Sequence, residues 1–260
     1  MDENIPVVIL CGGMGTRLRE QTEFMPKPLV EVGGKPILWH IMKIYSAYGY
    51  NNFILCLGYK GNMIKDYFHD LATKTHDFEL RMKSGEIKIN RDKNSVEDWR
   101  ITFVDTGMDA TTGGRIKKIE PYIKTDYFLC TYGDGVADIN IMEIVDFHRS
   151  KGKIATVTGV HPHSKYGVME LDKDDIVFHF TEKSLLESWV NGGFFVFNKD
   201  IFKFIDEDLP LEQDALPKIS EKKELAMFKF SGTWYCMDTY KDYLDLNKMW
   251  EEGNAKWKVW

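Results

Sequence analysis

Two basic side chains follow the first apolar run of the sequence and stand in segments that suit phosphate. The run Pro6–Cys11 is followed directly by the glycine-rich segment Gly12–Arg17. Glycines let backbone N–H groups approach a phosphate without obstruction, and the guanidinium of Arg17 offers forked donors that match phosphate oxygens. The segment therefore predicts a phosphate-binding loop, although its glycines alone also fit an ordinary turn.

Lys27 is the second basic residue, and it lies between two prolines, Pro26 and Pro28. Proline fixes its own φ and restricts the residue before it, so Lys27 is expected in a constrained, extended backbone. A lysine that delivers charge to one phosphate oxygen benefits from this restraint, whereas a surface lysine does not need it. For this segment taken alone, a surface loop stays open as the alternative.

The spacing of these residues excludes two common nucleotide-binding motifs. A dinucleotide-binding loop has the pattern G-x-G-x-x-G, but position 18 is leucine. A Walker A loop requires G-x-x-x-x-G-K-[ST], which no segment of the chain supplies.

Two aspartates are placed where a metal ion could bind phosphate. Asp134 follows the apolar run Tyr127–Thr131 and is flanked by glycines, and Asp238 also follows an apolar run. Ligands of parallel sheets bind at the carboxyl ends of the strands. Since Mg²⁺ favours a few carboxylates completed by substrate and water, Asp134 and Asp238 are predicted to be its ligands. Gly-Asp-Gly is equally good turn chemistry, so either aspartate alone is ambiguous.

The elements that must position these side chains alternate between strands and helices. This alternation predicts an α/β fold with a Rossmann-like, mostly parallel sheet and helices on both faces. Beyond Gly152 the pattern shifts towards strands. The expected strands are Pro6–Cys11, Phe53–Leu57, Arg100–Val104, Tyr127–Thr131, Ala155–Val160, Val168–Leu171, Val177–Thr181 and Phe194–Phe197, and the expected helices are Pro36–Tyr48, Met63–Leu71 and Ile141–His148.

The chain is expected to form a single domain of two halves, about 1–150 and about 151–238, followed by a tail, 239–260. Residues 78–94 are charged and poorly periodic, which predicts short strands or a loop. The tail begins as a helix and contains Trp250, Trp257 and Trp260. Exposed terminal aromatics more often dock on a neighbour than hang free, so a subunit contact and a homo-oligomer are predicted.

The amino-acid composition limits the classes of partner that this protein is expected to bind. The chain has 260 residues, 43% of them hydrophobic, and a net charge of −6, which argues against general nucleic-acid binding. No run approaches the roughly 20 apolar residues of a membrane span. The four cysteines stand singly, without zinc spacing, and are expected to be buried reduced thiols of a cytoplasmic protein.

The motifs together resemble the sugar-phosphate nucleotidyltransferase family. Its nucleotide-binding signature is similar to C-G-G-M-G-T-R-L at Cys11–Leu18 with Lys27 ten residues after Arg17. Arg19-Glu20 and Tyr132-Gly133-Asp134 resemble the cytidylyl branch and not the thymidylyl branch, which has proline and Leu-Gly-Asp there. Further segments that resemble the cytidylyl branch are 98–107, 112–115, 131–138, 190–196, 237–239 and 253–258.

The resemblance implies a glycosyltransferase-A-like fold and a set of functional residues. Arg17, Lys27 and Asp134 are expected to be catalytic. Nucleotide binding is expected at Leu10, Cys11, Gly12, Gly13, Met14, Gly15, Thr16, Arg17, Lys27, Thr106, Arg115 and Gly133. The residues expected to bind the sugar phosphate are Glu182, Lys183, Asn191, Gly192 and Gly193, although Ser184 replaces the proline usual after Glu-Lys.

The implied reaction joins CTP and α-D-glucose 1-phosphate to give CDP-glucose and pyrophosphate, with Mg²⁺ as the cofactor. Two alternatives stay open: UTP, dTTP or another phosphorylated acceptor, and a non-catalytic nucleotide-sensing homologue. Retention of the charged set argues against the second alternative, because a protein without activity has no reason to keep every member. That set is Arg17, Lys27, Asp134, Lys183 and Asp238.

Overall fold

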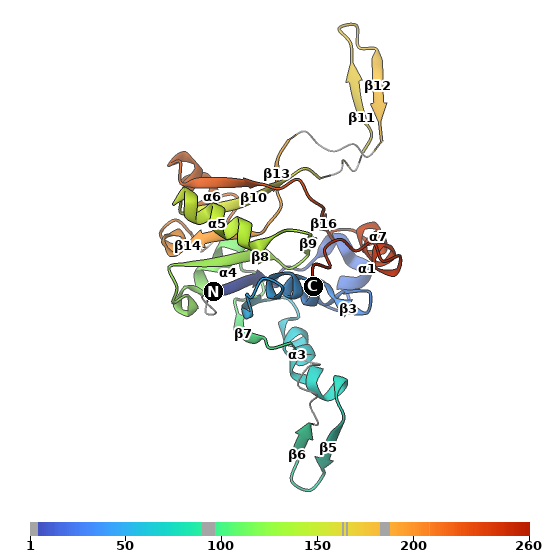
Figure 1. Cartoon of the computed structure of the whole chain (residues 1–260), viewed down its shortest axis with the longest axis vertical. Helices are drawn as coiled ribbons and strands as arrows, with labels where there is room; N and C mark the ends of the chain where they lie inside the picture. The colour runs from blue at the N-terminus through green and yellow to red at the C-terminus, as the bar shows by residue number, and fades with distance from the viewer. Residues whose placement is uncertain (1–4, 90–96, 163, 165, 183–187, 208) are drawn as a thin grey trace.

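The computed structural model describes residues 5–89, 97–162, 164, 166–182, 188–207 and 209–260. Its main sheet crosses the body of the molecule (Figure 1) and has eight strands: β1 (Pro6–Leu10), β4 (Asn52–Leu57), β7 (Arg100–Asp105), β8 (Tyr127–Tyr132), β10 (Ala155–Val160), β13 (Val190–Asn191), β14 (Phe195–Asn198) and β15 (Leu225–Lys229). The order is β13-β10-β14-β8-β1-β4-β7, and β15 pairs with β10.

The centre of the sheet is parallel and brings several strand ends to one edge. β8, β1, β4 and β7 are parallel neighbours, and Leu10 at the end of β1 is in register with Cys56 and Tyr132. β14 then runs antiparallel to β8, and β10 antiparallel to both β13 and β14. The predicted α/β fold with a mostly parallel sheet is confirmed, and both halves of the chain contribute to this one sheet.

Alternate side chains of the central strands enter two separate cores. Val7 and Ile9 belong to one buried cluster, whereas Val8 and Leu10 belong to the other. Such strands are apolar on both faces because helices cover both. The first cluster includes side chains of α2 (Ile37–Ser46), α3 (Gly61–Thr75), α5 (Ile141–Lys151) and α7 (Tyr240–Glu251), and the second those of α4 (Thr112–Lys118) and α6 (Ala215–Glu221).

The predicted strands and helices are all present, but the helices α1 (Arg19–Thr22), α4 and α6 and the sheet strand β15 were not predicted. α4 contains two glycines and α6 a proline, and both residue types lower helix propensity. The remaining short elements are β2 (Glu31–Val32), β3 (Lys35–Pro36), β9 (Gly135–Ala137), β16 (Trp234–Cys236) and 3₁₀ turns at Thr16–Leu18, Lys27–Leu29, Glu120–Tyr122 and Lys199–Lys203.

Two hairpins project from the body in opposite directions (Figure 1). One pairs β5 (Phe78–Arg81) with β6 (Glu86–Ile89), so the charged segment expected from residue 78 forms short strands; residues 90–94 of that expectation lie outside the described part. The other pairs β11 (Val168–Leu171) with β12 (Val177–Thr181). We refer to them as the β5–β6 arm and the β11–β12 arm.

The C-terminal tail packs on its own chain. Trp257 is 1% exposed and belongs to the first core cluster, where Trp250 and Trp260 are partly buried. Trp250, Trp257 and Trp260 surround His40 of α2 with ring centroids 4.8–6.3 Å away. The expectation that these tryptophans are exposed is therefore wrong, and a subunit contact through the tail stays a prediction.

Two further expectations concern the cysteines, predicted to be buried thiols, and membrane-spanning segments, predicted to be absent. Cys11, Cys56 and Cys130 are buried, Cys236 is partly buried, and all four are free thiols. In the ranges that the structure describes, no helix combines the length and the apolar character needed to cross a membrane.

Candidate active site

Four charged side chains meet at the carboxyl edge of the parallel strands. Nζ of Lys27 donates to Oδ2 of Asp134 at 2.5 Å and to Oδ1 of Asp238 at 2.8 Å. Nη1 of Arg17 donates to Oδ2 of Asp238 at 2.8 Å. The sequence-predicted cations and aspartates thus form one cluster, in which two positive and two negative charges alternate.

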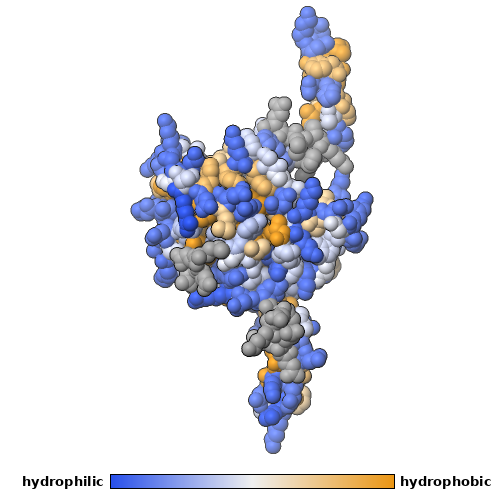
Figure 2. Space-filling view, in the orientation of Figure 1, coloured by the Kyte–Doolittle hydropathy of each residue, from blue (hydrophilic) through white to orange (hydrophobic). Residues whose placement is uncertain are grey.

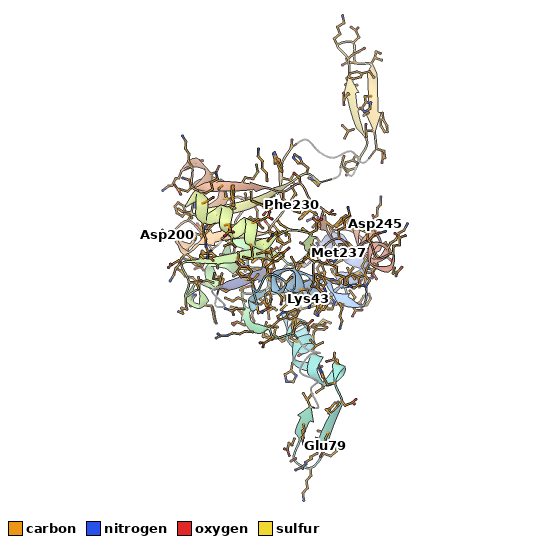
Figure 3. All side chains as sticks on the ribbon, in the orientation of Figure 1. Lys43, Glu79, Asp200, Phe230, Met237 and Asp245 are labelled. Carbon is orange, nitrogen blue, oxygen red and sulfur yellow. The ribbon has the colours of Figure 1, made fainter. Side chains whose placement is uncertain are left out.

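The two aspartates are far apart in sequence, and a short strand pair brings them together. Asp134 lies between β8 and β9, and Asp238 follows β16. β9 pairs antiparallel with β16, so that Gly135 lies opposite Cys236, and the Met237 N–H donates to the carbonyl of Asp134 at 2.9 Å. Figure 3 labels Met237, the residue before Asp238, on the body between the two arms.

The position of Lys27 between two carboxylates keeps its side chain protonated. Its side chain is 11% exposed, and Pro26 and Pro28 flank it. The expectation of an extended backbone is wrong, because Lys27 begins the 3₁₀ turn Lys27–Leu29, which the N–H groups of Leu29 and Val30 close by donating to the carbonyls of Pro26 and Lys27. Burial lowers its pKa, but the charge of Asp134 and hydrogen bonds to Asp134 and Asp238 outweigh this and raise the pKa above its ordinary 10.5. An ammonium fixed between two carboxylates shows that this place is arranged to hold positive charge.

The donor set at this place fits a hard divalent cation. Ligand atoms of Asp134, Cys236 and Asp238 lie within 4.8 Å of one another. Burial and the nearby carboxylates raise the pKa of the Cys236 thiol, so it stays protonated and is a poor ligand for Mg²⁺. Of these three groups the two aspartates are the better ligands for such an ion, and their assignment as its ligands stays a prediction.

A cavity of about 340 Å³ opens above this cluster. Its size falls in the range of small-molecule sites. Ten residues predicted from the sequence line it, and four were missed. The predicted ones are Leu10, Cys11, Gly12, Gly13, Gly15, Arg17, Lys27, Arg115, Gly133 and Asp134; the missed ones are Pro28, Ala110, Thr112 and Tyr132.

The glycines of the loop after β1 have separate physical roles. Gly12 is packed so closely that a Cβ there would lie 2.0 Å from Nη1 of Arg115. Gly15 has a φ of +63°, which a residue with a side chain rarely adopts. Gly13 has open space around the position of a Cβ, so its backbone faces the cavity without obstruction. Met14 and Thr16 are exposed and are not among the lining residues.

Arg115 ties the cavity wall together through both terminal nitrogens of its guanidinium. Its guanidinium donates to the Thr106 hydroxyl at 2.8 Å and to the carbonyls of Gly107 at 2.8 Å, Gly12 at 3.0 Å and Met108 at 3.1 Å. Thr106 is fully buried, and its hydroxyl donates to a β4 carbonyl at 2.7 Å. Arg115 and Thr106 thus tie the glycine loop to the loop after β7.

The predicted sugar-phosphate residues are placed in two different regions. Asn191 donates from Nδ2 to the Tyr132 hydroxyl at 3.0 Å, so the turn Asn191–Gly193, which includes Gly192, adjoins the cavity wall. Glu182 is exposed at the end of β12 on the projecting β11–β12 arm, and it is not among the lining residues. Lys183 lies outside the described residues.

Two of the missed residues had signals in the sequence. Tyr132 ends the strand that leads to Asp134, and its side chain lies in the second core cluster below the cavity. Thr112 opens a helix that the two following glycines concealed. Ala110 sits in the loop before α4, where no local pattern distinguishes it.

The site combines a glycine loop after β1, the buried cation of Lys27, the exposed cation of Arg17 and a pair of carboxylates at the carboxyl edge of a parallel sheet. These are features of an enzyme that handles the phosphate groups of a nucleotide.

The chain belongs to the nucleotidyl transferase family, which residues 6–253 match. It is 45% identical over 255 residues to the probable glucose-1-phosphate cytidylyltransferase of Bacillus subtilis, covering 97% of this chain and 99% of that one. The glucose-1-phosphate cytidylyltransferase of Salmonella typhi is 44% identical over 256 residues, covering 97% and 98%. The fold matches a UDP-glucose pyrophosphorylase structure with a TM-score of 0.68 at 16% identity, covering 96% and 99%.

Proposed function

We propose that this enzyme transfers a cytidylyl group from CTP to α-D-glucose 1-phosphate, giving CDP-glucose and pyrophosphate. The observation that carries the proposal is the cluster of Arg17, Lys27, Asp134 and Asp238 at the cavity. The near full-length similarity to two cytidylyltransferases supports the choice of substrates. A cytoplasmic location, in keeping with four free thiols, is part of the same proposal.

The reaction needs positive charge and positioning more than it needs a base. The second pKa of a phosphate monoester is about 6, so the sugar phosphate is already mostly dianionic at neutral pH. One of its oxygens forms a bond to the α-phosphorus of CTP, while the bond from that phosphorus to the β-phosphate oxygen breaks. Arg17 would hold the departing pyrophosphate and Lys27 the α-phosphate, so that two polyanions can meet.

Asp134 and Asp238 would hold a Mg²⁺ ion. When bound, the ion supplies positive charge to the phosphate oxygens. Both carboxylates accept hydrogen bonds from Lys27, so they lie close together.

Selectivity for cytosine is the test of the proposed substrate. Cytosine offers an N4 donor and an N3 acceptor, whereas uracil and thymine invert both, and a pocket set for one pattern leaves its groups unpaired against the other. We expect kcat/KM for CTP to exceed that for UTP and dTTP by more than tenfold, or about 1.4 kcal/mol. The measurement is pyrophosphate release at fixed glucose 1-phosphate.

The same assay with several sugar 1-phosphates at fixed CTP tests the acceptor. A preference for CTP of tenfold or less, or better turnover of another sugar phosphate, contradicts the proposed pair of substrates. Family membership does not depend on that result.

We further propose that the enzyme is a homo-oligomer, with the arms as contacts between copies. On the β11–β12 arm, Phe180 lies opposite Met169 and His179 opposite Glu170, so the first pair lies on one face, which is apolar, and the second on the other face, which is more polar. Phe180 and Met169 are 59% and 58% exposed. The β5–β6 arm likewise exposes Met82 at 85%, and Figure 2 shows apolar side chains along both arms. An isolated two-stranded hairpin is marginally stable in water, so a covered apolar face is favoured.

Placing a charge on this apolar face is expected to separate the copies. Phe180→Glu puts a carboxylate into the proposed contact, where its desolvation is unfavourable, so light scattering should report a smaller particle. His179→Glu adds the same charge on the polar face of the same strand and should leave the mass unchanged. An unchanged mass for Phe180→Glu, or a monomeric wild type, contradicts the proposal.

A further inference from the structure

A chain of hydrogen bonds joins the cavity wall to the Asn191–Gly193 turn. Tyr132 lines the cavity, and its hydroxyl donates to Oε1 of Glu212 at 2.6 Å and accepts from Nδ2 of Asn191 at 3.0 Å. Oδ1 of Asn191 accepts from the Gly193 N–H at 2.9 Å. Because the Tyr132 hydroxyl both donates and accepts, its ring is fixed at the outer end as well as at the backbone.

Glu212 is held firmly enough to orient that hydroxyl. Its Oε2 accepts from the Thr112 hydroxyl at 2.7 Å, and the same hydroxyl accepts from the Leu211 N–H at 2.9 Å. The loop that carries Glu212 approaches α4 closely because Gly113 has no side chain: a Cβ there would lie 2.4 Å from the Leu209 carbonyl oxygen. Glu212 does not line the cavity itself, so it acts on the cavity through Tyr132 and Thr112.

The turn contacts the nucleotide half through the ring of Tyr132, among other contacts. Gly193 has a φ of +76°, and a Cβ there would lie 3.1 Å from Cδ2 of Tyr132, so turn and ring are in direct contact. On the other side, the Gly192 N–H donates to a β10 carbonyl at 2.9 Å, and Nε1 of Trp234 donates to the Gly192 carbonyl at 2.8 Å. Tyr132 lies two residues before Asp134, and thus connects the turn with the metal-binding strand end.

We propose that Tyr132 is a positioning residue for the sugar phosphate: its hydroxyl, oriented by Glu212, sets the Asn191–Gly193 turn against the nucleotide cavity. The proposal rests on the proposed function, in which this turn binds the acceptor.

Tyr132→Phe tests the role because it keeps the ring and removes only the hydroxyl. We expect the KM for glucose 1-phosphate to rise about tenfold, as for the loss of one or two hydrogen bonds, while the KM for CTP changes less than about twofold. Tyr127→Phe is the matched control. It lies at the opposite end of β8, where its hydroxyl accepts from Arg149 at 2.7 Å, and both KM values should stay unchanged.

Glu212→Gln provides a second, independent variant. It should raise the KM for glucose 1-phosphate as well, and the double variant should be within about twofold of Tyr132→Phe, because the two residues act as one unit. Equal increases in both KM values indicate a merely structural role and overturn the proposal, as does an unchanged KM for glucose 1-phosphate in either folded variant. A wild type that does not turn over CTP with glucose 1-phosphate overturns the proposed function and this inference with it.

Discussion

Asp134→Asn is expected to keep the fold and to lose about 10²- to 10³-fold in kcat, the range seen when one preorganised electrostatic group is removed. The substitution preserves the size of the side chain but removes one of the two carboxylates proposed to bind Mg²⁺. It also removes the charge that accepts the 2.5 Å hydrogen bond from Lys27. The measurement is steady-state pyrophosphate release with CTP, glucose 1-phosphate and saturating Mg²⁺, together with thermal melting.

The control for Asp134→Asn is the same substitution at Asp245. Asp245 is exposed on α7 and labelled in Figure 3, and its loss of charge should leave kcat within about twofold, as for surface substitutions generally. Near-normal turnover in a folded Asp134→Asn protein would falsify the metal assignment. A weaker dependence of melting temperature on Mg²⁺ in the variant than in the wild type gives support that does not depend on turnover.

Much of the fold could be predicted because its central strands bury both faces. A run such as Val7–Leu10 is apolar at every position, and this pattern occurs where helices cover both sides of a parallel sheet. The packing of the C-terminal tail could not be predicted from such a local pattern. Its tryptophans were expected to be exposed, but they pack around His40, more than 200 residues earlier, and local sequence carries no sign of such a contact.

In the candidate site, too, residues with a local sequence signal could be predicted, and contacts between distant residues could not. Arg17, Lys27 and Asp134 carry local signals, namely a glycine loop, a pair of prolines and a strand end, and the structure brings all three together. The Tyr132–Glu212 contact joins residues 80 positions apart, so no spacing rule could reveal it. The contacts of Arg115 were also hidden, since a sequence shows a cation but not the backbone carbonyls to which its terminal nitrogens donate.

Lys27→Ala is expected to lower kcat/KM by about 10² or more, or about 2.7 kcal/mol, because a fixed ammonium is lost where negative charge gathers in the reaction. The loss should fall on kcat, since Lys27 is held in place before substrate arrives and its charge matters most in the transition state. If KM alone rises and kcat is intact, Lys27 binds the ground state and is not part of the transition-state machinery. Lys27→Met fills more of the vacated space and tests whether lost packing contributes.

Lys27→Arg separates charge from geometry and should restore less than about a tenth of the wild-type kcat/KM. The Lys27 ammonium reaches Asp134 and Asp238 at 2.5 and 2.8 Å from a backbone held by Pro26 and Pro28. Space beside it is limited, because the Lys27 side chain is only 11% exposed. A planar guanidinium is larger and directs its donors in fixed directions, so it cannot replace a compact ammonium at this place. Full activity of Lys27→Arg would show instead that positive charge alone is required, in which case the proline restraint has no catalytic role.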